Sequence, residues 1–157
     1  MSALLIVQLV SVFTTGLLAG IFFGDRMGNS YARPKLSASA FVTFQQVQNV
    51  RFARMMPLPI LAALVSDVLW LVLLRDHMDL SSFRLLAVGT LALFLAVVLT
   101  RVVNIPINNR LGKWSSASPP SDFTSTWARW ERVHTVRTIL AVLSFALVLA
   151  AFGLTSS

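Results

Sequence analysis

The sequence predicts an all-α fold: a bundle of four transmembrane helices with helical extensions on the cytoplasmic side. Of its 157 residues, 56% are hydrophobic and only 12% are charged, about half the charged fraction of a soluble domain. Four windows are long enough to cross a bilayer, which takes roughly 20 apolar residues. They cover residues 3–24, 56–74, 83–103 and 138–154. A soluble bundle would need a polar stripe along each helix, and these windows are apolar all round.

The distribution of basic residues predicts the topology. Eleven of the 13 Lys and Arg residues lie in the stretches 26–54 and 101–137, and only Arg75 and Arg84 lie in or beside the short connection between the second and third windows. The positive-inside rule then places both long polar stretches in the cytoplasm and both termini outside. We therefore expect one integral membrane domain, residues 1–157, whose net charge of +7 reflects topology and not nucleic-acid binding.

The first window carries glycines at a spacing of four residues. Gly16, Gly20 and Gly24 lie along one slowly turning stripe, where another helix can approach the backbone closely. The stripe is expected to pack against a neighbouring helix of the bundle, with a homo-oligomer seam as the alternative. The run has no cationic start and is too long for a signal peptide, so we expect a retained helix.

The second window follows a more polar helix. The pattern of residues 37–55 predicts an interfacial helix or a cytoplasmic extension of that window. Pro57 is then expected to mark a kink or a helix start. Inside the window, Asp67 lies at about the depth of Ser11 and Thr14 on the first window. An isolated carboxylate inside a membrane is costly, so we expect it to be hydrogen-bonded to such a hydroxyl and to be structural.

The third window ends in a proline. Pro106 has no backbone N–H and its ring clashes with the carbonyl of Val102, so a break or kink is predicted near Asn104. The Ser- and Pro-rich stretch 112–126 is predicted to be the one long loop. Its last polar residues are candidate N-caps of the fourth helix: Asp122, Ser125 and Thr126.

The start of the fourth helix gathers polar and aromatic side chains. Trp127, Glu131 and His134 line one face, while Trp130, His134 and Arg137 line an overlapping one. An imidazole between a carboxylate and a guanidinium can act as a general base near neutral pH. The alternative is an interfacial belt, with tryptophan anchors and snorkelling arginines.

A metal site is weakly indicated. Glu131-x-x-His134 has the spacing with which bundle helices present ligands to a di-iron centre, but that centre needs a second such pair. The only other histidine is His77, in the opposite loop, and there is no cysteine, which excludes disulfides and thiolate metal sites. A single metal ion held by Glu131, His134 and amide oxygens stays open.

Two segments carry a family resemblance. Asn104-x-Pro106-x-Asn108, followed by Trp127-x-x-Trp130-x-x-x-His134-x-x-Arg137, resembles the anthrone oxygenase-like family of small four-helix membrane proteins. Many of its members belong to domain of unknown function 1772. The resemblance extends from the glycine-rich first helix through the fourth. It implies an oxygenase that acts in aromatic polyketide biosynthesis, where dioxygen converts an anthrone methylene to the quinone carbonyl.

The resemblance and the residues together give a candidate site that requires no resident cofactor, with dioxygen as co-substrate and a hydrophobic aromatic molecule as partner. His134 would be the base and Glu131 would set its tautomer. The amides and the arginine would stabilise the oxyanion, and the indoles would stack on the rings of the substrate. The candidate catalytic residues are His134, Glu131, Arg137, Asn104 and Asn108, and the candidate substrate contacts are Trp127, Trp130, Asn109 and Gln45. A metal-dependent oxygenase and a non-enzymatic binding or transport protein are the alternatives.

Overall fold

The computed structural model describes residues 2–77 and 81–156, and all the regular secondary structure within them is helical. The predicted all-α class is therefore confirmed for the described chain. The α-helices are α1 (Ala3–Gly24), α2 (Ser30–Ala32), α3 (Ala38–Met55), α4 (Pro57–Leu73), α5 (Ser81–Leu99), α6 (Ile105–Leu111) and α7 (Phe123–Ser156). Shorter helical turns join them: η1 (Asp25–Asn29), η2 (Arg33–Lys35), η3 (Arg75–His77) and η4 (Thr100–Asn104).

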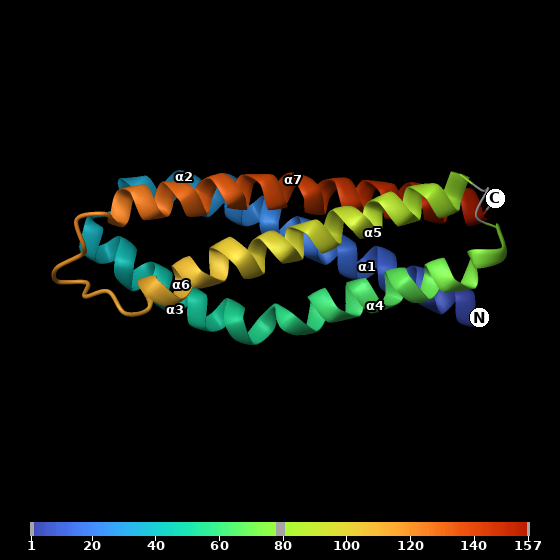
Figure 1. The fold of residues 1–157 in the computed structure, drawn as a ribbon, viewed down its shortest axis with the longest axis horizontal. Coiled ribbons are helices and arrows are strands. Elements are labelled where there is room, and N and C mark those ends of the chain that lie inside the picture. Colours follow the sequence, from blue (N-terminus) through green and yellow to red (C-terminus); the bar gives the residue numbers. More distant parts are fainter. Residues whose placement is uncertain (1, 78–80, 157) are drawn as a thin grey trace.

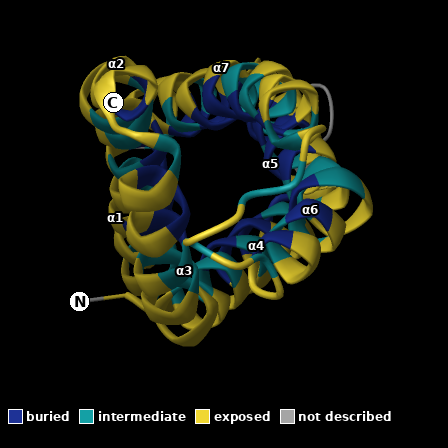
Figure 2. Ribbon diagram, turned by 90° about the vertical axis from the view of Figure 1, so that its left-hand side faces the viewer, coloured by how far each residue is buried: buried dark blue, intermediate teal, exposed yellow. Residues whose placement is uncertain are grey.

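Four long helices form an elongated antiparallel bundle. α1 packs against α4 and α7, and α5 packs against the same two helices from the other side. Seen along the bundle, the buried residues face inward and the exposed ones outward (Figure 2). The two termini lie at one end, while α2, α3, α6 and the loop before α7 lie at the other (Figure 1).

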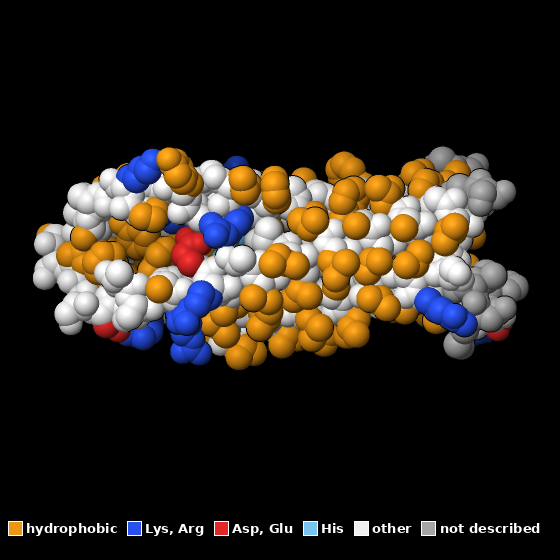
Figure 3. Space-filling model, turned by 90° about the horizontal axis from the view of Figure 1, so that it is seen from above, with side chains coloured by type: hydrophobic (Ala, Val, Ile, Leu, Met, Phe, Trp, Pro, Cys, Tyr) orange, Lys and Arg blue, Asp and Glu red, His pale blue; other side chains and the backbone are white. Residues whose placement is uncertain are grey.

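The described chain contains three helical stretches that are long and apolar enough to cross a membrane. They run Ala3–Lys35, Ser81–Leu111 and Phe123–Thr155. A fourth crossing is present if α3 and α4, which bend by 41° where they meet, are counted together. On the face shown in Figure 3, hydrophobic side chains cover the middle of the bundle and charged groups gather toward its ends. The chain is thus built as a multi-pass membrane protein.

Of the break or kink predicted near Asn104, the break is absent, because the third long helix continues past Pro106. The distortion falls in η4, a π-helical turn that ends at Asn104, and the helix continues through α6 to Leu111. The N–H of Ile105 bonds to the carbonyl of Thr100, five residues back, so the helix has widened ahead of the proline. This wider turn accommodates Pro106, which has no backbone N–H to donate, and the helix continues.

Other expectations at helix ends are confirmed in part. Ser37 caps α3 by accepting from the N–H of Ala40, and α4 begins at Pro57. The predicted loop 112–126 is shorter than expected, because α7 already begins at Phe123. Asp122 precedes the helix and accepts a bond from the hydroxyl of Thr126 at 3.2 Å. Ser125 and Thr126 lie inside α7, so their assignment as N-caps was wrong.

Asp67 is buried and bonded as predicted. The hydroxyl of Ser11 on α1 donates to one of its carboxyl oxygens, which joins α1 to α4 in the middle of the bundle. Toward the α3–α6 end, Leu18, Ala63 and Leu93 form an apolar layer across three helices. This layer separates Asp67 from the polar groups described below.

Only one member of the glycine stripe contacts another helix. A Cβ built at Gly16 would lie 2.9 Å from the ring of Phe145 on α7, whereas at Gly20 and Gly24 it would meet nothing within 4 Å. The expectation that the whole stripe packs inside the bundle was therefore wrong. The stripe turns slowly around α1, and beyond Gly16 it has rotated away from α7 to the outer surface.

A glycine on α5 lies close to the backbone of α7. At Gly89, an added Cβ would lie 3.2 Å from the backbone oxygen of Ser144 and from Cβ of Leu147. Backbone cannot move aside as a side chain can, so this contact requires the absence of a side chain on α5.

We expect Gly89→Leu to lower the thermal midpoint of the detergent-solubilised protein, because overpacking costs about 1–3 kcal/mol. Gly20→Leu should leave the midpoint unchanged or raise it, since its new side chain enters open space and leucine favours helix. Differential scanning fluorimetry of the two variants makes the comparison. Equal losses would place Gly20 against a neighbour and contradict the described packing.

Candidate functional site

Two π-helical turns lie at the same level of the bundle, near the α3–α6 end. η1 follows α1 directly, and η4 lies between α5 and α6. Both pack against α7. π-helical turns inside α-helices occur frequently at functional sites, because they displace side chains from the regular helical register. The residues that meet α7 at this level form the polar cluster of the protein.

Arg33 lies at the centre of this cluster, with only 2% of its surface exposed. Its Nη2 lies 2.7 Å from Asp25 Oδ1 and its Nη1 lies 3.3 Å from Glu131 Oε1. Further bonds run from the guanidinium to side-chain oxygens of Gln45, Gln48 and Ser30. All three nitrogens of the guanidinium are therefore satisfied inside the protein, as a buried cation requires.

Asp25 is the acceptor on which several donors converge. Its carboxylate receives two bonds from Arg33, one from Asn29 at 2.7 Å and one from Gln48 at 3.0 Å. Oδ2 also lies 3.0 Å from Nε2 of His134, although it stands off the N–H axis of the ring. The carboxylate is held rigidly between a cation and an imidazole.

His134 is fully buried and both of its ring nitrogens face protein groups. Nε2 faces Asp25, and Nδ1 accepts a hydrogen bond from Nε of Arg137 at 3.2 Å. Because Nδ1 is an acceptor, the ring is neutral and carries its proton on Nε2. Arg137 extends further to Thr100 on η4, whose hydroxyl accepts from Nη1 at 3.1 Å. A continuous chain therefore runs from Asp25 through His134 and Arg137 to Thr100.

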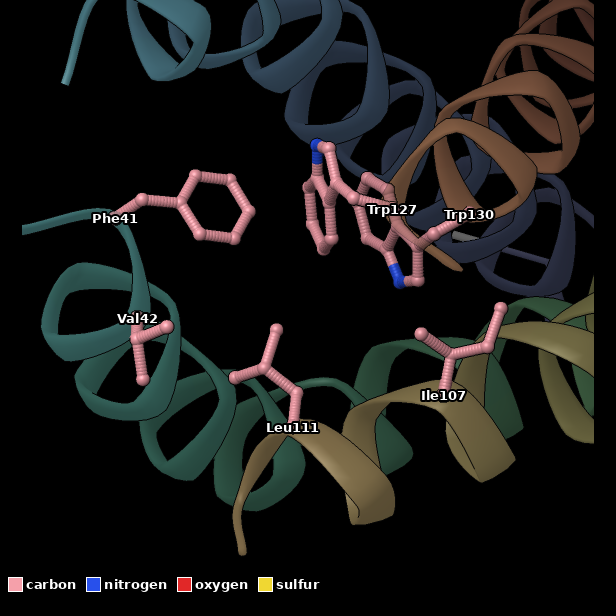
Figure 4. Close-up of a cluster of buried hydrophobic side chains, with 6 residues drawn as sticks. All are labelled: Phe41, Val42, Ile107, Leu111, Trp127 and Trp130. Carbon is pink, nitrogen blue, oxygen red and sulfur yellow. The ribbon is translucent and has the colours of Figure 1, made fainter. Parts of the chain in front are cut away.

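An aromatic wall adjoins this chain. The indoles of Trp127 and Trp130 stack with centroids 4.3 Å apart and an interplanar angle of 14°, and Trp130 lies 4.8 Å from the ring of His134. Phe41 of α3 meets Trp127 edge-on (Figure 4). The guanidinium of Arg33 lies 5.3 Å from both indole centroids, within the range of a cation–π contact. The two indoles therefore cover each other, and the faces that they turn to one another are not open to a substrate ring.

The asparagines of the third helix reach Trp130. Asn108 accepts from the indole N–H of Trp130 at 2.9 Å, and Asn104 donates to the backbone carbonyl of the same residue at 3.3 Å. Within the described chain, Oδ1 of Asn104 and Nε1 of Trp127 are buried without a hydrogen-bond partner. A free acceptor and a free donor thus remain beside the aromatic wall.

The structure brings most of the predicted site residues into one connected cluster. Arg137 bonds to His134, Gln45 and Glu131 bond to Arg33, and the 3.0 Å approach of His134 to Asp25 links the two groups. The asparagines bond to Trp130, whose ring lies against that of His134. Asn109 is exposed on the surface of α6, outside the cluster. The carboxylate at His134 belongs to Asp25, whereas Glu131 bonds to Ser30 at 2.8 Å and to Arg33.

Sequence reasoning missed several residues of the cluster. Asp25, Ser30 and Arg33 all follow α1, and Thr100 lies on η4; none had been singled out. A signal was present, because Asp25 is one of only six acids in the chain and directly follows an apolar helix. In the described chain, no group of three or more His, Cys, Asp or Glu side chains is placed to hold a metal ion.

Comparison with known proteins gives one match. The sequence model of the anthrone oxygenase family matches residues 44–147, well over half of the chain. No curated protein and no solved structure matches. The match begins inside α3, so it contains His134 and Arg137 but neither Asp25 nor Arg33. The first helix, to which the resemblance was expected to extend, lies outside the matched residues.

We expect Arg33→Met to destabilise the protein by roughly 3–5 kcal/mol, because it leaves the carboxylate of Asp25, and the partly buried one of Glu131, without their cation. Arg110→Met is the matched control: its ion pair with Asp122 is about half exposed on both sides, so the loss should stay below about 1 kcal/mol. Thermal unfolding in detergent compares the two. Similar small losses would mean that the buried network does not hold the bundle end together.

Proposed function

The chain belongs to the anthrone oxygenase family, and on this basis we propose that it is a membrane-embedded oxygenase. It oxidises an activated aromatic carbon of the anthrone type with dioxygen and yields a quinone. The observation that carries the proposal is the buried chain Asp25–His134–Arg137 beside stacked indoles. It offers a base, a group that orients the base and a cation for a developing oxyanion.

The chemistry needs no resident redox cofactor. An anthrone methylene loses a proton to a base and becomes an extended enolate, which is electron-rich enough to react with dioxygen. A carbon–oxygen bond forms, and the resulting peroxide takes up a proton. Loss of the remaining C–H proton together with hydroxide from the peroxide then leaves the carbonyl. Methylene and dioxygen are thereby converted to carbonyl and one water.

His134 is the proposed base, acting through Nδ1. Asp25 holds the proton on Nε2 and stabilises the imidazolium that forms, the role that a buried carboxylate has in a catalytic triad. In the resting structure Arg137 occupies Nδ1. We propose that the substrate oxygen attracts the guanidinium of Arg137, which frees Nδ1 for the methylene proton and stabilises the enolate.

The other residues support the site indirectly. Asn104 and Asn108 fix Trp130 from two directions, and the unpaired oxygen of Asn104 can accept a substrate hydroxyl. Glu131 acts through Arg33 and Ser30 and does not touch His134. Gln45 fixes the guanidinium of Arg33. Asn108, Glu131 and Gln45 are therefore positioning groups, because they act through Trp130 or Arg33.

The proposal includes a topology. α1, the α3–α4 pair, α5 and α7 would give four crossings, with the loop before α7 and the α2–α3 region in the cytoplasm and both termini outside. The supporting observations are the shared end of the termini and the eleven basic residues in the two long polar stretches. The site would then lie at the cytoplasmic side of the membrane.

Single-cysteine labelling tests this topology, since the chain has no native cysteine. We expect Ser118→Cys, in the loop before α7, to react with an impermeant maleimide only after the membrane is opened. Ser2→Cys, at the other end, should react in intact cells. Labelling of Ser118→Cys from outside in intact cells would reverse the assignment.

His134→Ala should lower the turnover of an anthrone by about 100-fold or more without unfolding the protein, because general-base catalysis contributes that much. Oxygen consumption and quinone absorbance of the detergent-purified protein give the rate. Arg129→Ala, an exposed change on the same helix, should retain full activity. Full activity in His134→Ala would contradict the assignment of His134 as the general base.

Two further outcomes separate the alternatives. Activity that disappears with a chelator and returns with one metal would make Glu131 and His134 ligands, contrary to the proposed cofactor-free reaction. No oxygen consumption by the wild-type protein with any anthrone would leave a binding or transport protein. The proposal expects chelator-resistant turnover.

A further inference from the structure

Arg137 is a buried cation that no carboxylate neutralises directly. Only 9% of its surface is exposed. Its hydrogen bonds go to two neutral acceptors, Nδ1 of His134 at 3.2 Å and the hydroxyl of Thr100 at 3.1 Å. Among the described residues, none of the ion pairs involves Arg137. A buried guanidinium is normally paired with an anion, because the desolvation of its charge is costly.

The two carboxylates of the cluster are held elsewhere. Both Asp25 and Glu131 bond to Arg33. Asp25 lies at Nε2 of His134, whereas Arg137 lies at Nδ1, so the two groups meet different edges of the imidazole ring. While His134 is neutral, the two guanidiniums and the two carboxylates balance in number, but both negative charges are bonded to Arg33. The part of the cluster around Arg137 is therefore electropositive.

The guanidinium of Arg137 keeps a donor within reach of a ligand. The ring centroids of Phe22 and Trp130 lie 4.8 Å and 5.4 Å from its Cζ, within the range of cation–π contacts. These rings attract the cation, but they do not neutralise it. Nη2 donates to no described residue and still has accessible surface. A small planar carboxylate matches such a donor, because guanidinium N–H groups point outward in one plane.

We propose that Arg137 and His134 together bind a small monovalent carboxylate, and that this anion enters with one proton, which His134 takes up at Nδ1. As an account of how the site is inhibited, the inference rests on the proposed function. The carboxylate accepts from the guanidinium, whose Nε leaves Nδ1. A proton from solvent then forms the new N–H bond at Nδ1. The resulting imidazolium donates through Nε2 to Asp25 and through Nδ1 to the bound anion.

Hydrogen bonding and charge both require the proton. A carboxylate is a stronger acceptor for a guanidinium than a neutral imidazole is, so the anion draws Arg137 away and leaves Nδ1 of His134 buried without a donor. The anion also adds a negative charge to a cluster whose charges otherwise balance. Protonation of Nδ1 removes both costs. The charged groups around the imidazole are Asp25 of η1, Arg33 of η2, and Glu131 and Arg137 of α7, while η4 contributes the neutral Thr100.

Nitrogen NMR of the imidazole ring tests the inference directly. The chain has two histidines, so the His77→Gln protein with isotope-labelled histidine gives the signals of His134 alone. We expect sodium formate, titrated at constant ionic strength in lipid nanodiscs, to convert these signals from the neutral Nε2–H form to the imidazolium. The affinity for formate should fall about tenfold for each unit of pH, the slope that uptake of one proton requires. Signals that remain those of the neutral ring throughout the titration would overturn the inference.

A matched pair of variants identifies the guanidinium. Arg137→Gln removes the charge and keeps an N–H donor, so the binding of formate should weaken about tenfold or more. Arg132→Gln, an exposed change on the same helix, should leave the binding unchanged. Equal losses in the two variants would assign the anion to surface cations and overturn the inference. The titration of the His77→Gln protein needs neither change, so it decides the case if Arg137→Gln does not fold.

The outcomes distinguish this inference from the proposed function. Formate should compete with an anthrone in oxygen-consumption assays, and its inhibition constant should decrease as the pH is lowered. Formate binding with proton uptake in a protein that oxidises no anthrone would keep the anion site and remove the oxygenase. Anthrone oxidation by a protein whose His134 signals do not respond to formate would keep the oxygenase and remove the anion site. Formate binding that leaves His134 neutral would overturn the coupling to the proton.

Discussion

The cluster at the α3–α6 end depends on one buried cation. Arg33 joins the turn after α1 to α3 and to α7 by bonds to Asp25, Gln45 and Glu131. A guanidinium can do this because its donors lie in a plane and point in several directions, which a lysine cannot match. Its desolvation is offset only while every donor is satisfied. The helices must therefore meet in one register, and the cluster specifies that register more than it adds stability.

The same constraint fixes the imidazole. Asp25 is held by Arg33, Asn29 and Gln48, so its second oxygen has one position relative to Nε2 of His134. The ring is thereby oriented with Nδ1 toward Arg137. Preorganisation of this kind favours electrostatic catalysis, because the Asp25 carboxylate is already in place when positive charge develops on the ring. The two π-helical turns contribute by displacing Asp25 and Thr100 from regular helical positions.

Polar groups in the bundle are separated by apolar layers. Leu18, Ala63 and Leu93 lie between the cluster around His134 and the Ser11–Asp67 pair in the middle of the bundle. Asp67 therefore joins two helices and is not continuous with the site. The exterior over the middle of the bundle is apolar on the face shown in Figure 3.

The sequence by itself determined the helical class, the apolar segments, the hydrogen bond to Asp67 and the positions of His134, Glu131, Arg137 and the two indoles on α7. Each follows from local composition or from the 3.6-residue period. Only the tertiary structure decided that Asp25 and not Glu131 faces His134, that the indoles stack on each other, and that Gly20 lies outside. These depend on the rotation of one helix about its axis relative to another. Residues such as Asp25 and His134 are more than a hundred positions apart in sequence, and no local pattern encodes their distance.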